Sequence, residues 1–439
     1  MSPILIKTLG LLLSLSFLIV LHELGHFIPA KLFKTRVEKF FLFFDVKYAL
    51  FRKKIGETVY GIGWLPLGGY VKISGMIDES MDKAQMAEEP KPWEFRSKPA
   101  WQRLIIMVGG VTVNLILGFL IYMMILFVWG QEELKPEQMS HGFDVAKELQ
   151  QYGFKTGDVI LDVNGKPLDN ALEINKYLLV RDVSRVRVKH QNGVEETIML
   201  PDSIGDYVFK SGVRAPFIPR RTNTLDTVLL KSPGYIAGLR QNDKIIEVNG
   251  ATITYFDEIK QALKKNEVNT IIVERDTETK QILVTPGTDG KLGINSLTYA
   301  ELETTEKQFS FGEAIIKGFS FGYWTLHDYV VQFKYIFTKK GATQVGGFGT
   351  IASLFPPVWD WQQFWETTAL ISIILAFMNI LPIPALDGGH VAFLLYEMVT
   401  GRKPSDKFLE YAQMVGFILL IGLLVFANGN DIYRWLFDK

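Results

Sequence analysis

The segment His22-Glu23-Leu24-Gly25-His26 carries residue types at a spacing that suits metal chemistry. On a helix, positions i and i+4 share one face, so both imidazoles can reach a single ion. The glutamate between them can then contact a water molecule held by that ion. By composition alone this pattern should arise by chance in well under about 1% of chains of this length. It therefore predicts a zinc centre that activates water.

Two histidines leave a catalytic zinc one protein ligand short. The chain has no Cys, so His or a carboxylate must supply that ligand, and the next His is as distant as His141. A second segment, Asn379-Ile-Leu-Pro-Ile-Pro-Ala-Leu-Asp387-Gly-Gly-His390, offers a carboxylate. Its prolines should end a helix near Asn379 and leave carbonyls facing a cavity. Asp387 would lie beside that cavity, at the start of a helix over 391–399; the alternative is that Asp387 only caps this helix.

Four stretches without charge are long enough to cross a bilayer core of about 30 Å. They cover residues 8–21, 104–131, 367–386 and 411–430. The first could instead be a signal peptide, but no small-residue cleavage site follows it and the chain continues into the histidine motif. A charged motif inside a membrane span is costly and usually marks function.

Basic residues near the ends of these spans predict their orientation. They lie after the first span, before the second, and between the third and fourth: Lys31, Lys34, Arg36, Lys39, Arg52, Lys53, Lys54, Arg96, Lys98, Arg103, Arg402, Lys403 and Lys407. Both of these loops should be cytoplasmic. Both termini and residues 131–366 would then be extracytoplasmic, which in a bacterium predicts a multi-pass protein of the inner membrane with its active site toward the cytoplasm.

Charge over the whole chain argues against nucleic acid as a partner. The 439 residues contain 47 basic and 47 acidic side chains, whereas duplex binding draws on clustered Lys and Arg. The 48% hydrophobic content should divide between two populations, four lipid-facing helices and two small soluble cores.

Between the second and third spans the chain repeats itself. Residues 153–165 (GFKTGDVILDVNG) and 238–250 (GLRQNDKIIEVNG) match at six positions, which indicates a domain duplication. Each copy alternates apolar and polar residues and then turns at Asn-Gly, as a strand entering a tight turn does. With the loop and short helix of residues 232–239, the pattern resembles PDZ domains. Such domains bind extended peptides at a sheet edge; an equally weighted alternative is that the two modules only restrict access to the membrane site.

After these modules the sequence changes again. Phe311, Ile315, Phe319 and Tyr323 recur at helical spacing between polar residues. The spacing predicts an amphipathic helix that lies against the membrane or packs on the spans.

The two motifs that bracket the tandem modules resemble those of the site-2 protease family, in the bacterial branch typified by the regulator of sigma E protease. Residues 95–103 (FRSKPAWQR) and 65–72 (LPLGGYVK) also fit this branch, so the resemblance covers most of the chain. It implies a zinc metalloendopeptidase acting inside the membrane, with one Zn²⁺ per chain. It also implies a re-entrant β-loop between the first two spans that meets the substrate at membrane depth.

Carried over residue by residue, the resemblance makes His22, His26 and Asp387 the metal ligands and Glu23 the general base. Substrate would be bound by Asn379, Pro382, Gly68, Gly69 and Asn114. The implied substrates are single-span membrane proteins of the anti-sigma factor type, already shortened outside the cytoplasm, and remnant signal peptides. An extended substrate could pair with a strand at residues 60–73.

Three stretches depart from the family pattern. Residues 40–45 (FFLFFD) lack the expected glycines, and both 110–114 (GVTVN) and 346–351 (GGFGTI) lack a customary proline. None of these changes touches the predicted metal site; they concern how substrate is held.

The sequence therefore predicts a multi-pass α-helical membrane protein with four transmembrane helices and a re-entrant β-loop, carrying two inserted α+β PDZ-like domains. The expected parts are a first span with the histidine motif (1–30), the re-entrant region (31–97), a second span (98–130), PDZ-like domains (131–220 and 221–303), amphipathic linker helices (304–362), a third membrane segment (363–399) and a fourth span (408–437). Two rival functions remain open: a PDZ-based scaffold with a structural metal, and a metal transporter, although transporters usually show repeated halves within the membrane.

Overall fold

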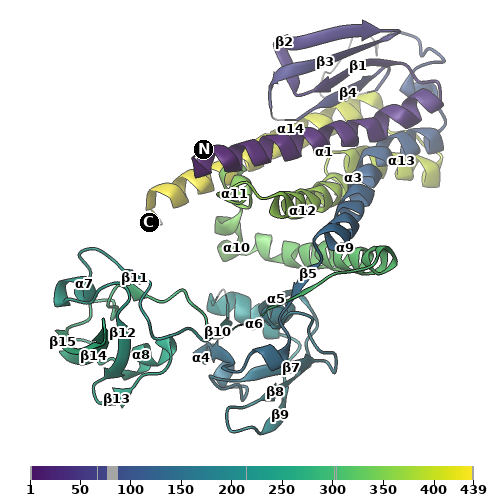
Figure 1. Cartoon of the computed structure of the whole chain (residues 1–439). Coiled ribbons are helices and arrows are strands. Elements are labelled where there is room, and N and C mark those ends of the chain that lie inside the picture. The colour runs from purple at the N-terminus through teal and green to yellow at the C-terminus, as the bar shows by residue number, and fades with distance from the viewer. Residues whose placement is uncertain are drawn as a thin grey trace. The chain divides into compact units, whose positions relative to one another are not determined.

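The computed structural model of the chain describes residues 2–66, 68–76, 88–213, 215–300, 302 and 304–437. It divides into two compact units. The first comprises Met1–Gly130 and Gln308–Lys439, and the second comprises Gln131–Lys307 (Figure 1). Each unit is described by itself below.

In the described part of the chain, four helices of the first unit are long and apolar enough to span a membrane. They are α1 (Pro3–Leu32), α3 (Ala100–Val128), α12 (Trp361–Ile380) and α14 (Asp406–Phe437). All four coincide with the predicted spans. Helix α12 ends at Ile380, directly before the two prolines, as expected from their missing amide hydrogens. Helix α13 (Asp387–Thr400) then starts at Asp387 itself, four residues earlier than predicted.

Helix α3 packs on α1, α9, α12 and α13. Its contact with α1 is close because glycines face each other there. A Cβ built on Gly25 would overlap the Gly109 carbonyl group, and a Cβ on Gly109 would overlap the Gly25 carbonyl oxygen. Small residues at such a crossing let two membrane helices approach backbone to backbone. The crossing lies within the histidine motif, so α3 forms one wall of the predicted site.

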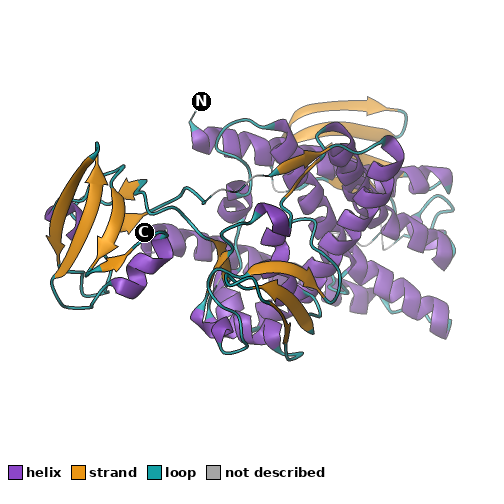
Figure 2. Cartoon of the chain, turned by 60° about the horizontal axis from the view of Figure 1, so that its bottom comes forward, coloured by secondary structure: helices purple, strands orange, loops and turns teal. Residues whose placement is uncertain are grey.

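Between α1 and α3 the chain forms a four-stranded sheet (Figure 2). Its strands are β1 (Val37–Leu42), β2 (Phe44–Ile55), β3 (Thr58–Leu65) and β4 (Tyr70–Ile73), in the order β2-β3-β1-β4. Strand β1 pairs in parallel with β3 and antiparallel with β4. The prediction of one strand over residues 60–73 was wrong: this stretch contains parts of β3 and all of β4, which lie on opposite sides of β1. Strand β4 is an edge strand and packs against α1.

The segment after the second unit contains the predicted amphipathic helix. Helix α9 (Phe311–Phe333) begins with a capping box formed by Ser310 and Glu313. It packs on α3, where Gly318 and Gly322 face Met123 and Phe119. Short helices follow: η4 (Lys334–Phe337), α10 (Lys339–Gln344) and α11 (Phe348–Ser353). A further short helix, η1 (Phe95–Ser97), precedes α3.

The second unit contains two hydrophobic cores, one for each predicted module. The elements of the first module are η2 (Pro136–Gln138), β6 (Phe143–Val145), α4 (Lys147–Gln150), β7 (Val159–Val163), η3 (Ala171–Glu173), α5 (Ile174–Val180), β8 (Arg185–Lys189), β9 (Glu195–Met199), α6 (Ile204–Ser211) and β10 (Phe217–Pro219). Those of the second are β11 (Thr227–Val228), α7 (Pro233–Ala237), β12 (Lys244–Val248), β13 (Ala251–Thr252), α8 (Phe256–Ala262), β14 (Asn269–Arg275), β15 (Glu278–Val284) and β16 (Ile294–Asn295).

The repeated motif has the predicted local structure in both copies. Strands β7 and β12 each end in an Asn-Gly turn, at Asn164-Gly165 and Asn249-Gly250. Both residues of each turn have positive φ (55° and 81°, 52° and 85°), a conformation that Asn and Gly tolerate best. The two ends of the unit also pair with each other, through β5 (Gln131–Glu133) and β17 (Thr305–Lys307).

Candidate active site

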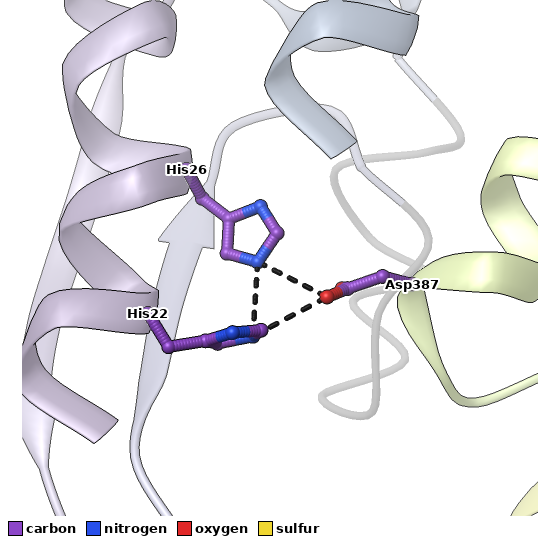
Figure 3. A group of neighbouring side chains, drawn as sticks. All are labelled: His22, His26 and Asp387. Carbon is purple, nitrogen blue, oxygen red and sulfur yellow. Dashed lines mark hydrogen bonds and ion pairs between the residues drawn. The ribbon is translucent and has the colours of Figure 1, made fainter. Parts of the chain in front are cut away.

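Helix α1 presents both histidines of the motif on one face. Their Nε2 atoms lie 3.3 Å apart, and the two rings meet edge to face with centroids 4.9 Å apart (Figure 3). His26 is buried, and His22 is partly buried. The helical spacing therefore brings the two imidazoles together as predicted.

Asp387, the first residue of α13, reaches the histidines directly after the turn that joins α12 to α13. Its Oδ2 atom lies 3.3 Å from the Nε2 atom of each histidine (Figure 3). The turn is tight: a Cβ on Gly388 would overlap the carbonyl group of Ile380, and a Cβ on Gly389 would lie 2.6 Å from the Ile383 oxygen. Residue 386 holds the N-cap position of α13 and Asp387 is already inside the helix, so the alternative of Asp387 as the cap was wrong.

The three ligand atoms fit a zinc ion. They form a triangle whose edges are each 3.3 Å. Tetrahedral zinc with bonds of about 2.0–2.1 Å requires ligand atoms about 3.3 Å apart. Among the described residues, Asp387 Oδ2 is buried without a hydrogen-bond donor, which is the state expected of an oxygen kept for a metal. His22, His26 and Asp387 are also the only described His, Cys, Asp and Glu residues whose ligand atoms cluster closely enough to hold an ion.

Helix α3 fixes the outer nitrogen of each imidazole. His26 Nδ1 lies 2.8 Å from the carbonyl oxygen of Ile106, which can only accept, so Nδ1 carries the proton and Nε2 is free for a metal. His22 Nδ1 lies 3.2 Å from Asn114 Nδ2. Between these two contacts, a Cβ on Gly110 would overlap His26 Nε2 and lie 2.7 Å from His22 Cε1. One face of α3 carries all three of these contacts, because Ile106, Gly110 and Asn114 are spaced four residues apart, about one helical turn.

Glu23 lies buried on α1 between the two histidines of the triangle. Strand β4 packs next to this part of α1. Strand β4 can come this close because residue 69 is glycine: a Cβ there would lie 2.5 Å from Ile19 and 3.6 Å from Glu23 Cγ. Helix α1 and the edge strand thus position the glutamate together.

A cavity of about 880 Å³ opens onto the site. The metal triad and Glu23 line it, as do four of the residues predicted to bind substrate, Gly68, Gly69, Asn114 and Asn379. The fifth, Pro382, is exposed and is not among the lining residues, so the structure does not group it with the others.

Two residues that position the site were absent from the sequence-based prediction. Gly110 was noted only for a missing proline beside it. It shares a helix face with Asn114, but no local sequence pattern places that face against the histidines. The other residue is Gln413 of α14, whose Oε1 accepts a hydrogen bond of 3.1 Å from the backbone N–H of Ala385. Ala385 holds a positive φ of 76° in the turn before Asp387. No sequence pattern links residues 385 and 413.

Comparison with known proteins identifies the family. The model of peptidase family M50 matches residues 10–423. The chain belongs to this family. The regulator of sigma E protease of Haemophilus influenzae is 28% identical over 96% of this chain and 98% of its own length. Metalloprotease MmpA of Caulobacter vibrioides is 25% identical over 99% of this chain and 97% of its own length. A Campylobacter jejuni protein named as a candidate zinc metalloprotease is 28% identical over 98% of this chain and 94% of its own length.

Membership of family M50 confirms the resemblance to the site-2 proteases and settles the class of activity. The protein is a zinc metalloprotease, and its apolar helices indicate a multi-pass membrane protein. Neither rival function, scaffold or transporter, accounts for this family relationship over almost the whole chain.

Proposed function

We propose that His22, His26 and Asp387 hold the zinc ion and that Glu23 is the general base of an endopeptidase that cleaves within the bilayer. The observation that carries this proposal is the triangle of ligand atoms, formed by residues of two different apolar segments and adjoining the buried carboxylate. Placing such a charged cluster among membrane helices would be costly without a function.

Zinc, when bound, would act as a Lewis acid that polarises the scissile carbonyl and lowers the pKa of a water molecule toward about 7. Glu23 accepts the proton of the attacking water and passes it to the departing amide nitrogen. The two histidines and Asp387 keep their positions because α3 and the α12–α13 turn support them.

The substrate must unwind before it can react, because every carbonyl within a transmembrane helix is hydrogen-bonded internally. Strand β4 offers a place for the extended chain. It is the edge of its sheet and lines the same cavity as the metal triad. A substrate strand added to this edge would present its peptide bonds to the site. Asn379, which also lines the cavity, would hold the substrate backbone, and the sheet would act as a re-entrant element at membrane depth.

The proposed substrates are single-span membrane proteins of the anti-sigma factor type that a first protease has already shortened, and remnant signal peptides. The name of the Haemophilus influenzae relative links that protein to sigma E regulation. We place the chain in a bacterial inner membrane, with both termini and residues 131–307 outside the cytoplasm, because basic residues gather in the loops at 31–103 and 402–407.

We assign the two modules of the second unit as PDZ-like. They would either bind extended peptide ends or exclude bulky substrates from the site. The Asn-Gly turns after β7 and β12 support a duplicated module, and short helices follow each turn.

The test uses purified full-length protein in detergent, with a single-span model substrate. Wild type should contain one zinc per chain and cleave. Glu23→Gln should retain zinc and lose activity by at least about 100-fold, because only the proton acceptor is removed. His22→Ala should lose both the bound zinc and the cleavage activity. Cleavage by Glu23→Gln at the wild-type rate would overturn the mechanism, and retention of biological function by His22→Ala would favour the scaffold.

A further inference from the structure

Asn114 is a buried amide that contacts a predicted metal ligand. It lies on α3 with a side chain almost fully buried, and its Nδ2 atom lies 3.2 Å from His22 Nδ1. Its backbone is fixed as well, since Ser372 of α12 donates a hydrogen bond of 2.7 Å to the Asn114 carbonyl oxygen. The amide is therefore held in front of the outer nitrogen of His22.

The proton on His22 decides which nitrogen can bind a metal. A neutral imidazole has one N–H donor and one acceptor, and only the acceptor nitrogen can be a ligand. The Nε2 atom of His22 faces Asp387 and His26, so zinc binding there requires the proton on Nδ1. A protonated Nδ1 is a donor and needs an acceptor opposite it.

Asn114 can supply that acceptor by turning its amide. Its Oδ1 atom is buried, and no described residue donates a hydrogen bond to it. The oxygen and nitrogen of an amide have nearly the same shape, so rotation by half a turn exchanges them without moving neighbours. In one orientation Nδ2 donates to an unprotonated Nδ1, and Nε2 carries the proton toward Asp387. In the other, Oδ1 accepts from Nδ1–H and leaves Nε2 free.

We propose that Asn114 is a positioning residue that selects the metal-binding tautomer of His22 through Oδ1, rather than a substrate-binding residue. The proposal rests on the zinc ligands assigned above. It deepens that assignment by naming the residue that prepares one of them. His26 needs no such side chain, because the Ile106 carbonyl oxygen already fixes its tautomer. Residues that orient metal ligands in this way typically change metal affinity by about 10–100-fold when replaced.

The experiment measures the zinc dissociation constant of the full-length protein in detergent, by competition with a chelator. Asn114→Leu keeps the side-chain volume and removes the acceptor, so it should bind zinc about 10–100-fold more weakly than wild type. Asn114→Asp keeps an acceptor oxygen at the same place and should bind zinc at least as tightly as wild type. Ser372→Ala removes the hydrogen bond to the Asn114 backbone but keeps the Oδ1 acceptor, so it should weaken zinc binding less than Asn114→Leu does.

Unchanged zinc affinity in Asn114→Leu would overturn the proposal. An equal loss of zinc affinity in Asn114→Leu and Asn114→Asp would also overturn it, because the residue would then act only through its packing. His22→Ala separates this failure from failure of the zinc site itself: if it retains zinc, the ligand assignment is wrong. A second measurement needs no variant. In zinc-loaded wild type with ¹⁵N-labelled histidine, the His22 proton should reside on Nδ1; a proton on Nε2 would contradict the inference.

Discussion

At the scale of single residues, the absence of a side chain at Gly110 shapes the metal site as much as the ligands do. The α-carbon of Gly110 faces both imidazoles, and an added Cβ would overlap His26 Nε2. Overpacking of a tight site typically costs about 1–3 kcal/mol, and here the atoms forced to move are metal ligands.

We therefore expect Gly110→Ala to weaken zinc binding by about 10-fold or more, which corresponds to about 1.4 kcal/mol. The measurement is chelator competition, followed by cleavage of the model substrate at saturating zinc. Gly422→Ala on α14 is the control, because no described atom beyond the neighbouring turns of its own helix lies within 4 Å of a Cβ built there. Equal zinc affinity in both variants would show that the histidines can shift without loss.

A second residue-scale prediction concerns His190 in the first module. Its Nε2 lies 2.9 Å from Glu196, and its Nδ1 lies 2.6 Å from the fully buried Asp158. The hydrogen bonds to Glu196 and then Asp158 raise the pKa of His190. A raised pKa in the folded state means that the charged ring stabilises the module fully below the unfolded pKa of about 6.5. This stabilisation is lost as the pH rises through the folded value.

His190→Gln should therefore destabilise the module more at pH 6 than at pH 9. Amide hydrogen exchange of β7, β8 and β9 in the full-length protein measures this, with both proteins compared at the same pH so that the intrinsic exchange rate cancels. The difference in protection should shrink as the pH rises; a difference that stays constant would mean that the ring acts only by packing.

At the scale of elements, local sequence patterns correctly predicted the features of structure that are determined by residues close together in the chain. The His22–His26 spacing, the prolines that end α12 and the Asn-Gly turns each determine structure within a few residues, and each prediction was confirmed. The division of residues 60–73 between β3 and β4 was missed because it depends on pairing with β1, and alternation alone does not reveal the partner. The contact of Asn114 with His22 was missed for a similar reason, since 92 residues separate them.

Helix α11 owes its position to another such distant contact. Asp431 of α14 accepts hydrogen bonds from the backbone N–H groups of Gly347 and Thr350, both at 3.0 Å. Asn428 accepts a third, from the N–H of Phe348 at 3.2 Å. These are orphan donors at the start of α11, which no residue within that helix can satisfy. Two side chains of α14 therefore cap α11.

Asp431→Ala should destabilise this contact by about 1–3 kcal/mol, because it leaves backbone donors unpaired. Hydrogen exchange of residues 347–353 should accelerate, while exchange in α1 and the zinc content stay at wild-type levels. Asp406→Ala is the matched control at the opposite end of α14, where the exposed carboxylate forms an ion pair of 3.6 Å with the exposed Lys403. Unchanged exchange at 347–353 would mean that the apolar contacts of α11 suffice to hold it.

At the scale of the whole molecule, the chain is a membrane unit whose sequence is interrupted by a self-contained insert. The insert begins and ends in one strand pair: Gln131, Glu132 and Glu133 of β5 lie opposite Lys307, Glu306 and Thr305 of β17. Opposed residues of antiparallel strands are only about 4.5–5.5 Å apart. A few residues can therefore replace the insert without stretching the chain between α3 and α9.

This geometry makes the restriction of access by the modules testable. A chain in which a short Gly-Ser linker replaces residues 131–307 should bind zinc as wild type does, since all proposed ligands lie in the membrane unit. If the modules exclude bulky substrates, the shortened chain should cleave a single-span substrate with an intact extracytoplasmic domain about as fast as a trimmed one, whereas wild type should prefer the trimmed form. Glu23→Gln in the shortened chain controls for other proteases. Undiminished preference for the trimmed substrate would remove the exclusion role and leave peptide binding as the function of the modules.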